Sequence, residues 1–384
     1  MNRLIPLIFL LISTSSQAYI GLCCGKCGGN MPMNIPGGGV PETHEFRLKV
    51  SPMVMHMEGL LDGTNDVAVN DVLGMPVMMG MPTGKYMAAP VSMDMTMNNV
   101  MLGYSFTDDF FAGLMLMHTS KSMDMRFNSM MQTMTGQQGF TMKSKGLADS
   151  MLMTKYRLFT DDPLIPRKQA SLLMSLSLPT GSIDERNTKH PVMMRRNELL
   201  PYGMQLGSGT VDPTVGFLYQ ASSSPYWWGA NLSYTARLYD NKRDYRLGNE
   251  LKLDLYGMYQ LRQDFLAQLQ LNFLDRGKIR GEADESVSGF SGHVSKNDPT
   301  SPFMTPLWDT DYYGKEQVSA TIGFQWQPTS LQIIDFSISK PLYTKTSGLQ
   351  LEDDYSVMLT WYVEMPTKNS RRYKKSSASG SLGF

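Results

Sequence analysis

The sequence has very little cysteine and, beyond its first residues, no long apolar run. Three cysteines, Cys23, Cys24 and Cys27, stand close together near the start of the 384 residues. A disulfide framework across the chain is therefore excluded. Past residue 12 no apolar segment is long enough for a transmembrane helix, and the mean hydropathy is −0.24. The chain is then either soluble after export or inserted in a membrane as strands, whose alternating residues hide their apolar face.

An excess of one charge is also absent, since 35 basic residues face 35 acidic ones. This balance argues against nucleic acid as a partner. Catalytic signals are scarce: among the five histidines only His118 lies in a predicted strand away from the methionine-rich start, at a position expected near the external rim. No G-x-S-x-G sequence is present. We expect no enzyme, no catalytic residue and no cofactor; an outer-membrane esterase is the second alternative.

The first residues have the three parts of a secretory signal, with Arg3 before the apolar run from Leu4 to Ile12 and small residues up to Ala18. We expect cleavage after Ala18. The predicted organisation is a signal peptide over 1–18, a flexible segment rich in Cys, Gly and Met over 19–45, a barrel over 46–365, and a basic, Ser-rich disordered tail over 366–384.

Alternation of apolar and polar residues predicts strands through most of the chain. The clearest example runs from Leu251 to Leu261, where Leu, Leu, Leu, Gly, Tyr and Leu alternate with Lys, Asp, Tyr, Met and Gln. About twelve such strands are predicted, an even number as in single-chain bacterial barrels. They lie near 46–58, 94–106, 110–120, 147–159, 169–178, 211–221, 226–239, 251–261, 265–273, 318–326, 334–338 and 355–364.

The connections between these strands alternate between short and long. Long ones cover 59–93, 121–146, 179–210, 240–247, 274–315 and 343–352, while short turns lie at 107–109, 161–167, 222–225, 262–264 and 328–330. This asymmetry predicts a closed antiparallel transmembrane β-barrel in the outer membrane of a Gram-negative cell, with short periplasmic turns and long extracellular loops. Aromatic residues flank the short turns as an interfacial girdle would: Tyr104, Phe106, Phe110, Phe111, Phe159, Tyr226, Trp227, Trp228, Phe265 and Trp326.

Polar residues on the second face of these strands cannot face lipid without a large free-energy cost. They are therefore predicted to line the lumen, which would be wet or hydrogen-bonded. The predicted lumen-lining residues are Lys252, Asp254, Gln268, Gln270, Asn272 and Asp335.

Methionine is abundant, with 33 residues of which 25 precede residue 160. Cys23, Cys24, Cys27, Met31 and Met33 supply thiols and thioethers that suit a soft ion such as Cu(I) or Ag(I). The alternatives are a disulfide, a lipid-bearing cysteine, and structural use of methionine. Within strands, methionine is interpreted as lipid-facing filler, as at Met95, Met97 and Met101.

Several stretches resemble a bacterial family of exported barrels linked to the MetA pathway of phenol degradation and often called transporters. The resemblance covers most of residues 46–364, with Ala148 where the family has glycine, and it implies a membrane barrel with a link to the transport of small organic molecules. The matching stretches are Met55-His56-Met57-Glu58-Gly59-Leu60, Gly146-Leu147-Ala148-Asp149, Lys155-Tyr156-Arg157-Leu158, Leu178-Pro179-Thr180-Gly181-Ser182-Ile183-Asp184, Pro201-Tyr202-Gly203-Met204-Gln205-Leu206-Gly207-Ser208-Gly209-Thr210 and Gln350-Leu351-Glu352.

The two central motifs are interpreted as bends, in which Pro179 and Gly181 end a strand and Gly207 and Gly209 permit a close approach of the backbone. The alternative is that these loops fold inward and narrow the pore. The sequence thus predicts a channel or transporter for small solutes, with soft-metal handling as the alternative. The expected partners are outer-membrane lipid, small solutes and the barrel-assembly machinery.

Overall fold

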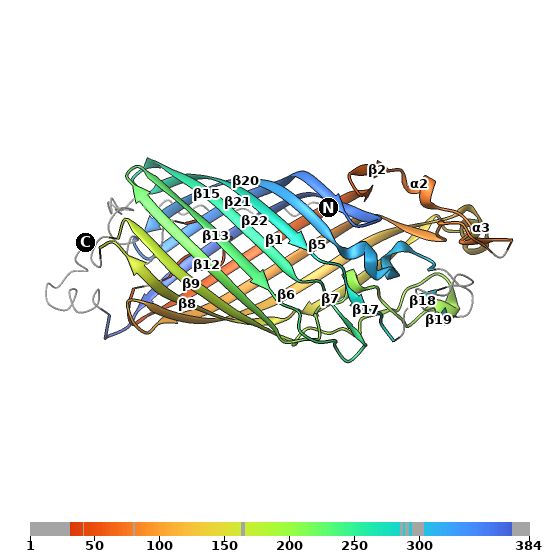
Figure 1. The fold of residues 1–384 in the computed structure, drawn as a ribbon, viewed down its shortest axis with the longest axis horizontal. Coiled ribbons are helices and arrows are strands. Elements are labelled where there is room, and N and C mark those ends of the chain that lie inside the picture. Colours follow the sequence, from red (N-terminus) through yellow and green to blue (C-terminus); the bar gives the residue numbers. More distant parts are fainter. Residues whose placement is uncertain are drawn as a thin grey trace, which may run out of the picture.

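Twelve long strands form one closed antiparallel barrel in the computed structural model, which describes residues 31–40, 42–79, 81–162, 166–284, 287–288, 292–293 and 303–370 (Figure 1). Each strand pairs with the next, and β1 pairs with both β22 and β5, which closes the sheet. The strands are β1 (Glu45–Asp62), β5 (Ala88–Ser105), β6 (Phe110–Phe127), β7 (Gly139–Leu147) continued by β8 (Ser150–Thr160), β9 (Lys168–Leu178), β12 (Asp212–Ser223), β13 (Tyr226–Thr235), β15 (Glu250–Arg262), β16 (Phe265–Arg276), β20 (Lys315–Thr329), β21 (Gln332–Thr346) and β22 (Gln350–Pro366).

β7 and β8 together form one of the twelve barrel strands. β7 pairs with the second half of β6, from His118 to Arg126, and β8 pairs with its first half, from Phe110 to Met115. The break between them lies at Ala148 and Asp149. An interrupted strand of this kind lets a loop approach the wall at the gap.

The remaining elements are short and lie mostly in the connections at one end of the barrel, on the right in Figure 1. Among the described residues, no helix is long and apolar enough to cross a membrane. These elements are β2 (Asn65–Val67), α2 (Val69–Val72), β3 (Val77–Met78), β4 (Met81–Pro82), α3 (Ser129–Thr135), β10 (Arg186–Asn187), η1 (Met193–Arg195), β11 (Glu198–Leu199), η2 (Tyr202–Met204), β14 (Tyr245–Arg246), β17 (Arg280–Gly281), β18 (Val287–Ser288), β19 (Gly292–His293), η3 (Pro306–Trp308) and η4 (Thr310–Tyr313).

All twelve predicted strands are confirmed, but several predicted long loops are wrong in extent. The predicted loop 59–93, for example, is shortened by β1, which continues to Asp62, and by β5, which begins at Ala88. β6 continues to Phe127 and β7 begins at Gly139, inside the predicted loop 121–146; β21 and β22 likewise shorten the predicted loop 343–352 to three residues, 347–349. The missed strand ends keep their alternation but carry polar residues outward, such as Asp124 and Arg126. Beyond the lipid an outward residue has no need to be apolar, so the expected alternation changes there.

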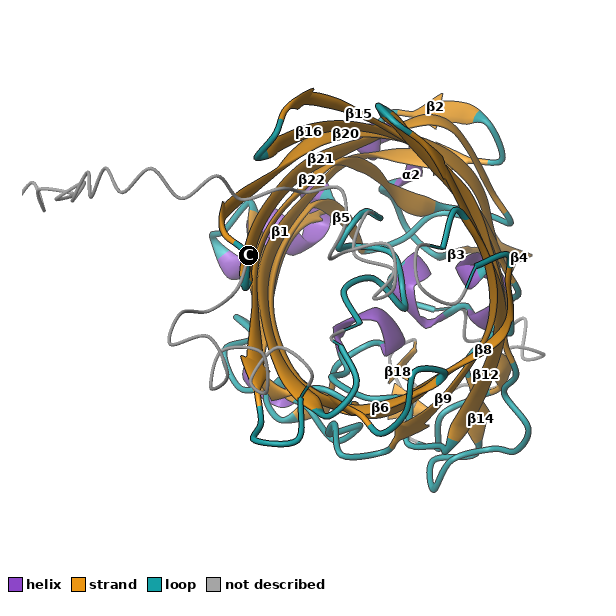
Figure 2. Ribbon diagram, turned by 90° about the vertical axis from the view of Figure 1, so that its left-hand side faces the viewer, coloured by secondary structure: helices purple, strands orange, loops and turns teal. Residues whose placement is uncertain are grey.

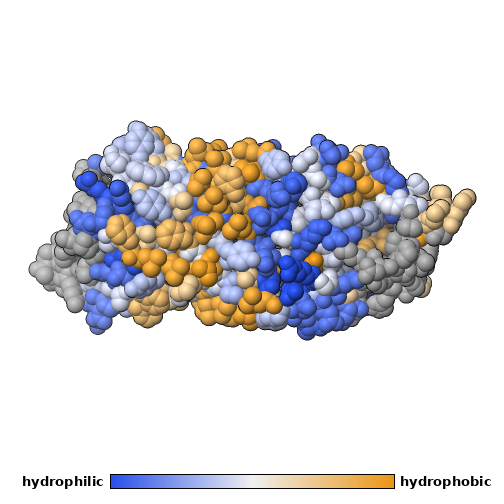
Figure 3. Space-filling view, in the orientation of Figure 1, coloured by the Kyte–Doolittle hydropathy of each residue, from blue (hydrophilic) through white to orange (hydrophobic). Residues whose placement is uncertain are grey.

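The outer face carries an apolar belt, followed toward the long-loop end by a hydrophilic surface (Figure 3). On β6, for example, outward Leu114 and Leu116 give way to Ser120 and Asp124. The predicted aromatic girdle is wrong at Phe111 and Trp227, which are buried inside the barrel. Exposed members of the belt include Phe46, Val54, Val100, Leu102, Phe106, Leu152, Phe159, Val215, Phe217, Tyr226, Trp228, Leu232, Leu255, Tyr259, Leu269, Ile322, Phe324, Trp326, Leu359 and Trp361.

Candidate functional site

Methionines line the inner wall on neighbouring strands, most of them on β1, β5, β6, β7 and β8. Because residues directly opposite each other on paired strands share a face, the register groups them into rows across the wall. One row is Met57–Met93–Met123–Met142, another is Met358–Met53–Met97, and a third is Met101–Met115–Met151. We call the inward methionines of β1, β5, β6, β7 and β8 the methionine wall: Met53, Met55, Met57, Met93, Met95, Met97, Met101, Met115, Met117, Met123, Met125, Met142, Met151 and Met153.

The interpretation of Met95, Met97 and Met101 as lipid-facing filler is therefore wrong. The other face of β5 carries Val100 and Leu102, both exposed, and it is this face that meets lipid. Met101 is almost fully buried in the lumen, where its sulfur accepts a hydrogen bond from Arg47.

Residues 31–40, here called the inner segment, lie inside the barrel at the end with the short turns. Met31 and Ile35 pack against Leu173, Leu218 and Trp227, among other buried residues of the wall. This corrects the prediction of a flexible segment over 19–45 for the part of it that the structure describes. Apolar side chains in a closed lumen bury more surface than in a free leader, which stabilises the folded position.

Polar contacts hold the backbone of the inner segment at both ends. Gln325 Nε2 donates to the Met31 oxygen at 2.7 Å, and Met33 N donates to Asp335 Oδ2 at 3.4 Å. Asn34 forms a reciprocal amide pair with Gln270, at 3.0 and 2.9 Å. Further along, Arg47 Nη1 donates to the Gly38 oxygen at 2.7 Å, Lys155 Nζ to the Gly37 oxygen at 3.4 Å, and Lys49 Nζ to the Met33 oxygen.

The residues predicted to line the lumen fall into two groups in the structure. Gln268 and Asp335 are buried and hydrogen-bonded to each other at 3.2 Å, and with Gln270 they surround the inner segment. Asp254 accepts from Asn272 at 2.8 Å and from Asn231 at 3.1 Å on the facing strands. Lys252 pairs with Glu250 at 2.8 Å and borders a cavity. Their role in transport stays a prediction.

That cavity has a volume of about 240 Å³ and lies between the inner segment and the barrel wall. Its apolar lining includes the third row of the methionine wall together with Met153, Leu173 and Met358, and its charged lining is Arg47, Lys49 and Lys252. An engineered apolar cavity of roughly 150 Å³ is already large enough for benzene. The lumen thus contains room for a small organic molecule.

The loop between β9 and β12 folds inward across the other end of the lumen. Lys121 on β6 donates to the carbonyl oxygens of Gly203 and Gln205 at 2.9 and 2.6 Å. Met204 is fully buried among methionines at the long-loop end of the wall, which include Met93 and Met123. A view along the barrel shows loop segments crossing the lumen (Figure 2). Of the two interpretations of the central motifs, the structure supports the inward-folded loop.

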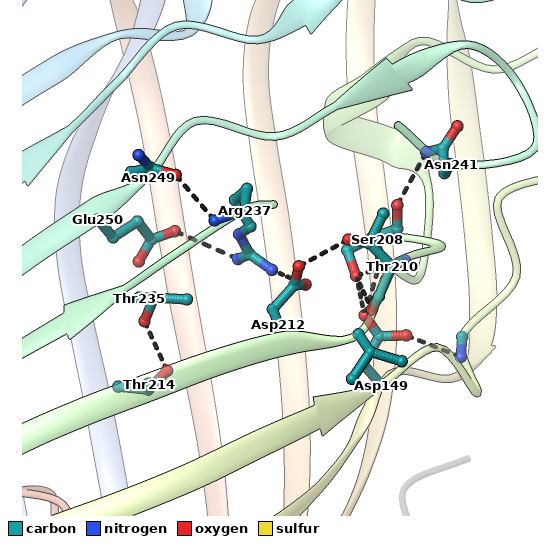
Figure 4. A network of polar contacts seen from close by, with 12 residues as sticks. Asp149, Ser208, Thr210, Asp212, Thr214, Thr235, Arg237, Asn241, Asn249 and Glu250 are labelled. Atoms are coloured by element: carbon teal, nitrogen blue, oxygen red, sulfur yellow. Dashed lines mark hydrogen bonds and ion pairs between the residues drawn. The ribbon is translucent and has the colours of Figure 1, made fainter. Parts of the chain in front are cut away.

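The same motifs form a network that anchors this loop, here called the loop latch (Figure 4). Asp149, at the gap between β7 and β8, accepts from Gly181 N at 3.0 Å and from the N and Oγ atoms of Ser208 at 2.8 Å each. Asn241 Nδ2 donates to the backbone carbonyl oxygen of Ser208 at 2.8 Å. Gly181 and Gly207 meet so closely that a Cβ on Gly181 would stand 2.7 Å from the Gly207 Cα.

A charged chain continues from the loop latch into the wall. Thr210 Oγ1 donates to Asp212 Oδ1 at 2.7 Å, and the guanidinium of Arg237 pairs with the fully buried Asp212 and, at 3.9 Å, with Glu250. A buried carboxylate needs such a partner, because an unpaired charge in the interior is strongly destabilising. Arg237 therefore makes the position of Asp212 possible.

A second, smaller pocket of about 70 Å³ lies in the outer loop layer. It is bordered by Phe127, Phe140, Met142 and the ring of His190, whose centroid lies 4.4 Å from that of Phe140. Val192 N donates to His190 Nδ1 at 3.1 Å, which fits a neutral imidazole. Burial, together with Arg195 and Arg196 nearby, lowers the pKa of His190 to about 4.

We expect acid to loosen this loop layer. The unfolded loop takes up a proton below about pH 6.5, whereas the folded one resists it until about pH 4. The stability contributed by neutral His190 is therefore full above pH 6.5 and falls by up to about 3 kcal/mol as the pH drops to 4. Limited proteolysis of loop 179–210 between pH 7 and 4 measures this; the His190→Asn variant should lose most of the pH dependence, and an unchanged profile contradicts it.

The predicted soft-metal ligands are only partly within the described residues. Cys23, Cys24 and Cys27 lie outside them, as do the signal peptide and residues 371–384 of the tail. Met31 and Met33 are buried, but in different apolar clusters: Met31 packs with Leu218 and Met33 with Tyr362. Among the residues that the structure describes, no group of three or more His, Cys, Asp and Glu side chains is placed to hold a metal ion.

His118, the histidine considered for an esterase, faces outward on β6. Its cross-strand neighbours are Asn98 and Leu147, and it stands where the outer face of β6 changes from Leu116 to Ser120. This level is the external rim of the apolar belt, although the strand itself continues to Phe127. The imidazole thus points away from the lumen and from the cavity.

Together these features define the chain as a transmembrane β-barrel of the outer-membrane type with an occupied lumen. No protein-family model matches the sequence, and no curated protein matches it either. In structure it is similar to an outer-membrane channel from Pseudomonas putida F1, with a TM-score of 0.50 and 10% identity over 84% of this chain and 96% of that one. The toluene transporter TodX of P. putida is more distant, with a TM-score of 0.39 and 8% identity over 85% and 91% of the two chains. The first likeness supports the fold, and the family resemblance remains a resemblance.

Proposed function

We propose that the protein is an outer-membrane channel for small, largely apolar organic molecules that move along the methionine wall. The observation that carries this proposal is the cavity of about 240 Å³ beside Met115, Met151 and Met153, inside a barrel with an apolar outer belt. Thioethers are polarizable and adaptable, and a sulfur–aromatic contact stabilises by about 0.3–1.5 kcal/mol. A polar solute would gain nothing from such a wall.

Passage requires movement at both ends of the lumen. The inner segment occupies the end with the short turns, and the loop held by Asp149 crosses the opposite end. The inner segment is joined to the wall by hydrogen bonds of side chains to its backbone and by packing, with no strand pairing. It can therefore leave its place without breaking the sheet.

Purified protein in planar bilayers and in liposomes tests the proposal. We expect channel events, and uptake of benzyl alcohol or toluene that is faster into liposomes with the protein than into liposomes without it. A folded protein, identified by its heat-dependent migration in SDS, that gives neither conductance nor uptake would contradict the channel. Outer-membrane lipid and the barrel-assembly machinery are the partners that such a protein needs, and cell fractionation tests its location.

We expect the double substitution Met115→Ser and Met151→Ser to lower the uptake of aromatic solutes about three- to tenfold. Both side chains border the cavity. Their replacement by serine removes two apolar contacts with the solute and therefore part of the hydrophobic free energy that favours its binding. Uptake by liposomes measures the effect. Met134→Ser, on the exposed side of α3, is the matched control and should leave uptake unchanged. Equal loss in both variants would show that the cavity is not on the path.

Soft-metal handling is a second candidate, and the row Met57–Met93–Met123–Met142 favours it. Four thioethers from adjacent strands are the kind of donor that Cu(I) and Ag(I) prefer. Titration with Ag(I) separates two possible sites. Replacement of Cys23, Cys24 and Cys27 by Ser tests the first, and replacement of Met93 and Met123 by Leu tests the second. Binding as tight as in the parent in both variants would reject the metal candidate.

A further inference from the structure

The charged lining of the central cavity has one sign only. Arg47 and Lys49 of β1 and Lys252 of β15 border it, and no carboxylate is among its lining residues. Arg47 is only 1% exposed. Buried arginine and lysine are normally paired with acids, because desolvating a lone charge costs several kcal/mol. A cationic cavity in a membrane barrel therefore requires an explanation.

Arg47 and Lys49 are held by neutral acceptors. Arg47 donates to the Gly38 oxygen at 2.7 Å and to the Met101 sulfur at 3.1 Å, and its guanidinium lies 4.1 Å from the centre of the Phe111 ring. Its Nε atom is buried without a hydrogen-bond partner. Lys49 donates to the Met33 oxygen. Within the described part of the chain, no ion pair joins either residue to a carboxylate.

Two other buried cations of the same barrel are paired with acids. Lys315 pairs with Asp353 at 3.0 Å, and Arg237 pairs with Asp212. Asp335, which interacts electrostatically with Lys49, accepts hydrogen bonds from Gln268, Gln325 and Met33 N on Oδ2, while its Oδ1 has no hydrogen-bond partner among the described residues. Lys315 and Arg237 thus have an acid within ion-pair distance, whereas Arg47 and Lys49 have none in the part of the chain that the structure describes. Glu364, opposite Arg47 on β22, and Asp335 act on these two cations electrostatically without forming an ion pair, so both can bind a carboxylate from outside.

We infer that the cavity binds a small organic anion, with its carboxylate on Arg47 and Lys49 and its apolar body against Met115, Met151 and Met153. This inference rests on the proposed function and names the class of solute. A carboxylate forms charge-assisted hydrogen bonds with a guanidinium and an ammonium, and these are stronger than bonds from the same groups to a neutral carbonyl. The methionine side of the cavity accepts the aromatic or aliphatic remainder.

The bound carboxylate competes with the inner segment. The donors that it takes up are the ones that hold the carbonyl oxygens of Gly38 and Met33. Binding therefore weakens two of the contacts that keep the inner segment in the lumen, and an organic anion favours the open barrel over the closed one. A neutral solute of the same shape lacks this effect.

The positive lining also bears on the metal candidate. A monovalent soft cation in this cavity would face Arg47 and Lys49 without a compensating acid among the lining residues. The methionines of the third row are therefore unsuited to Cu(I) or Ag(I), in contrast to the outermost row with Met93 and Met123.

Benzoate and benzyl alcohol, which share the ring and differ in charge, test the inference by calorimetry on the folded protein in detergent. We expect benzoate to bind at least about tenfold more tightly than benzyl alcohol. Lys49→Met should abolish this difference, while Lys252→Met, which removes a cation already paired with Glu250, should retain it. Arg47→Gln is a second variant, with heat-dependent migration in SDS as the check on folding.

Equal affinity of the parent for the two compounds, or a preference for benzoate that survives in Lys49→Met, would overturn the inference. Benzyl alcohol uptake into liposomes reports separately on the proposed function, because it does not depend on the charge of the solute. Normal uptake with no preference for the anion leaves the channel in place and rejects the anion site. In bilayers, benzoate should raise the open fraction and benzyl alcohol should not; binding without opening would reject the competition with the inner segment.

Discussion

Replacement of Gly39 by valine is expected to open the barrel at its short-turn end. Gly39 has φ = +67°, and a Cβ at this position would stand 2.6 Å from Cε2 and 2.9 Å from Cδ2 of Tyr362. The ring of Tyr362 is fully buried, and its hydroxyl donates to Glu364 at 2.7 Å, so it has no room to yield. The inner segment must then move, because the strand that carries Tyr362 is fixed by two neighbours.

The expected effect is an increase of at least about tenfold in the ratio of open to closed channels. A non-glycine residue held at a positive φ costs on the order of 1–3 kcal/mol, and about 1.4 kcal/mol is tenfold in an equilibrium. Conductance in planar bilayers measures it. Gly257→Ala is the control, since nothing lies within 4 Å of its Cβ position on the outer face. Unchanged conductance in a folded Gly39→Val barrel would show that the inner segment does not obstruct the path.

The inner segment illustrates what local sequence patterns do not contain. Residues 31–40 are rich in Met, Gly and Pro, which is typical of a flexible leader. Their place depends on partners about 200 to 300 residues away, such as Gln270 and Asp335. No periodicity relates these positions, and only the closure of the barrel brings them together.

The wall itself follows from local rules, since a period of two is a property of each strand alone. This is why Leu251–Leu261 and its neighbours were predictable. The period does not say which face of a strand points to lipid. The methionines of β5 do not decide this either, because both faces of that strand hold apolar residues. A signal was nevertheless present: Val100 and Leu102 share one parity and meet lipid, whereas Met97 and Met101 share the other.

The inward loop was predictable only as an alternative. Bends are indicated in either arrangement by Pro179, Gly181, Gly207 and Gly209. Glycine and proline favour a turn of the backbone, but they do not determine whether the loop then points into or out of the lumen. The residue that decides is Asp149, which stands in a separate matching stretch of the sequence. Its carboxylate reaches 32 and 59 residues along the chain, to Gly181 and Ser208.

Removal of that carboxylate is expected to release the loop. Asp149 is only 7% exposed and accepts three hydrogen bonds, two from backbone N–H groups and one from the Ser208 hydroxyl. In Asp149→Ala these donors lose their shared acceptor, and each buried donor left without a partner costs about 1–3 kcal/mol. A loss of several kcal/mol is comparable to the stability of a local loop structure, so loop 179–210 should leave the lumen while the twelve strands remain paired.

Two measurements distinguish release of the loop from general unfolding. Protease added on the extracellular side should cut loop 179–210 in Asp149→Ala at least about tenfold faster than in the parent, while heat-dependent migration in SDS stays that of a folded barrel. Asp149→Asn should be intermediate, because its amide keeps one acceptor oxygen. Asp124→Ala is the matched control: this exposed carboxylate on β6 accepts from Thr141 at 2.6 Å and contacts no part of the loop latch. If Asp149→Ala resists protease as well as the control does, the loop is held by its apolar contacts around Met204, and the shared motifs are bends after all.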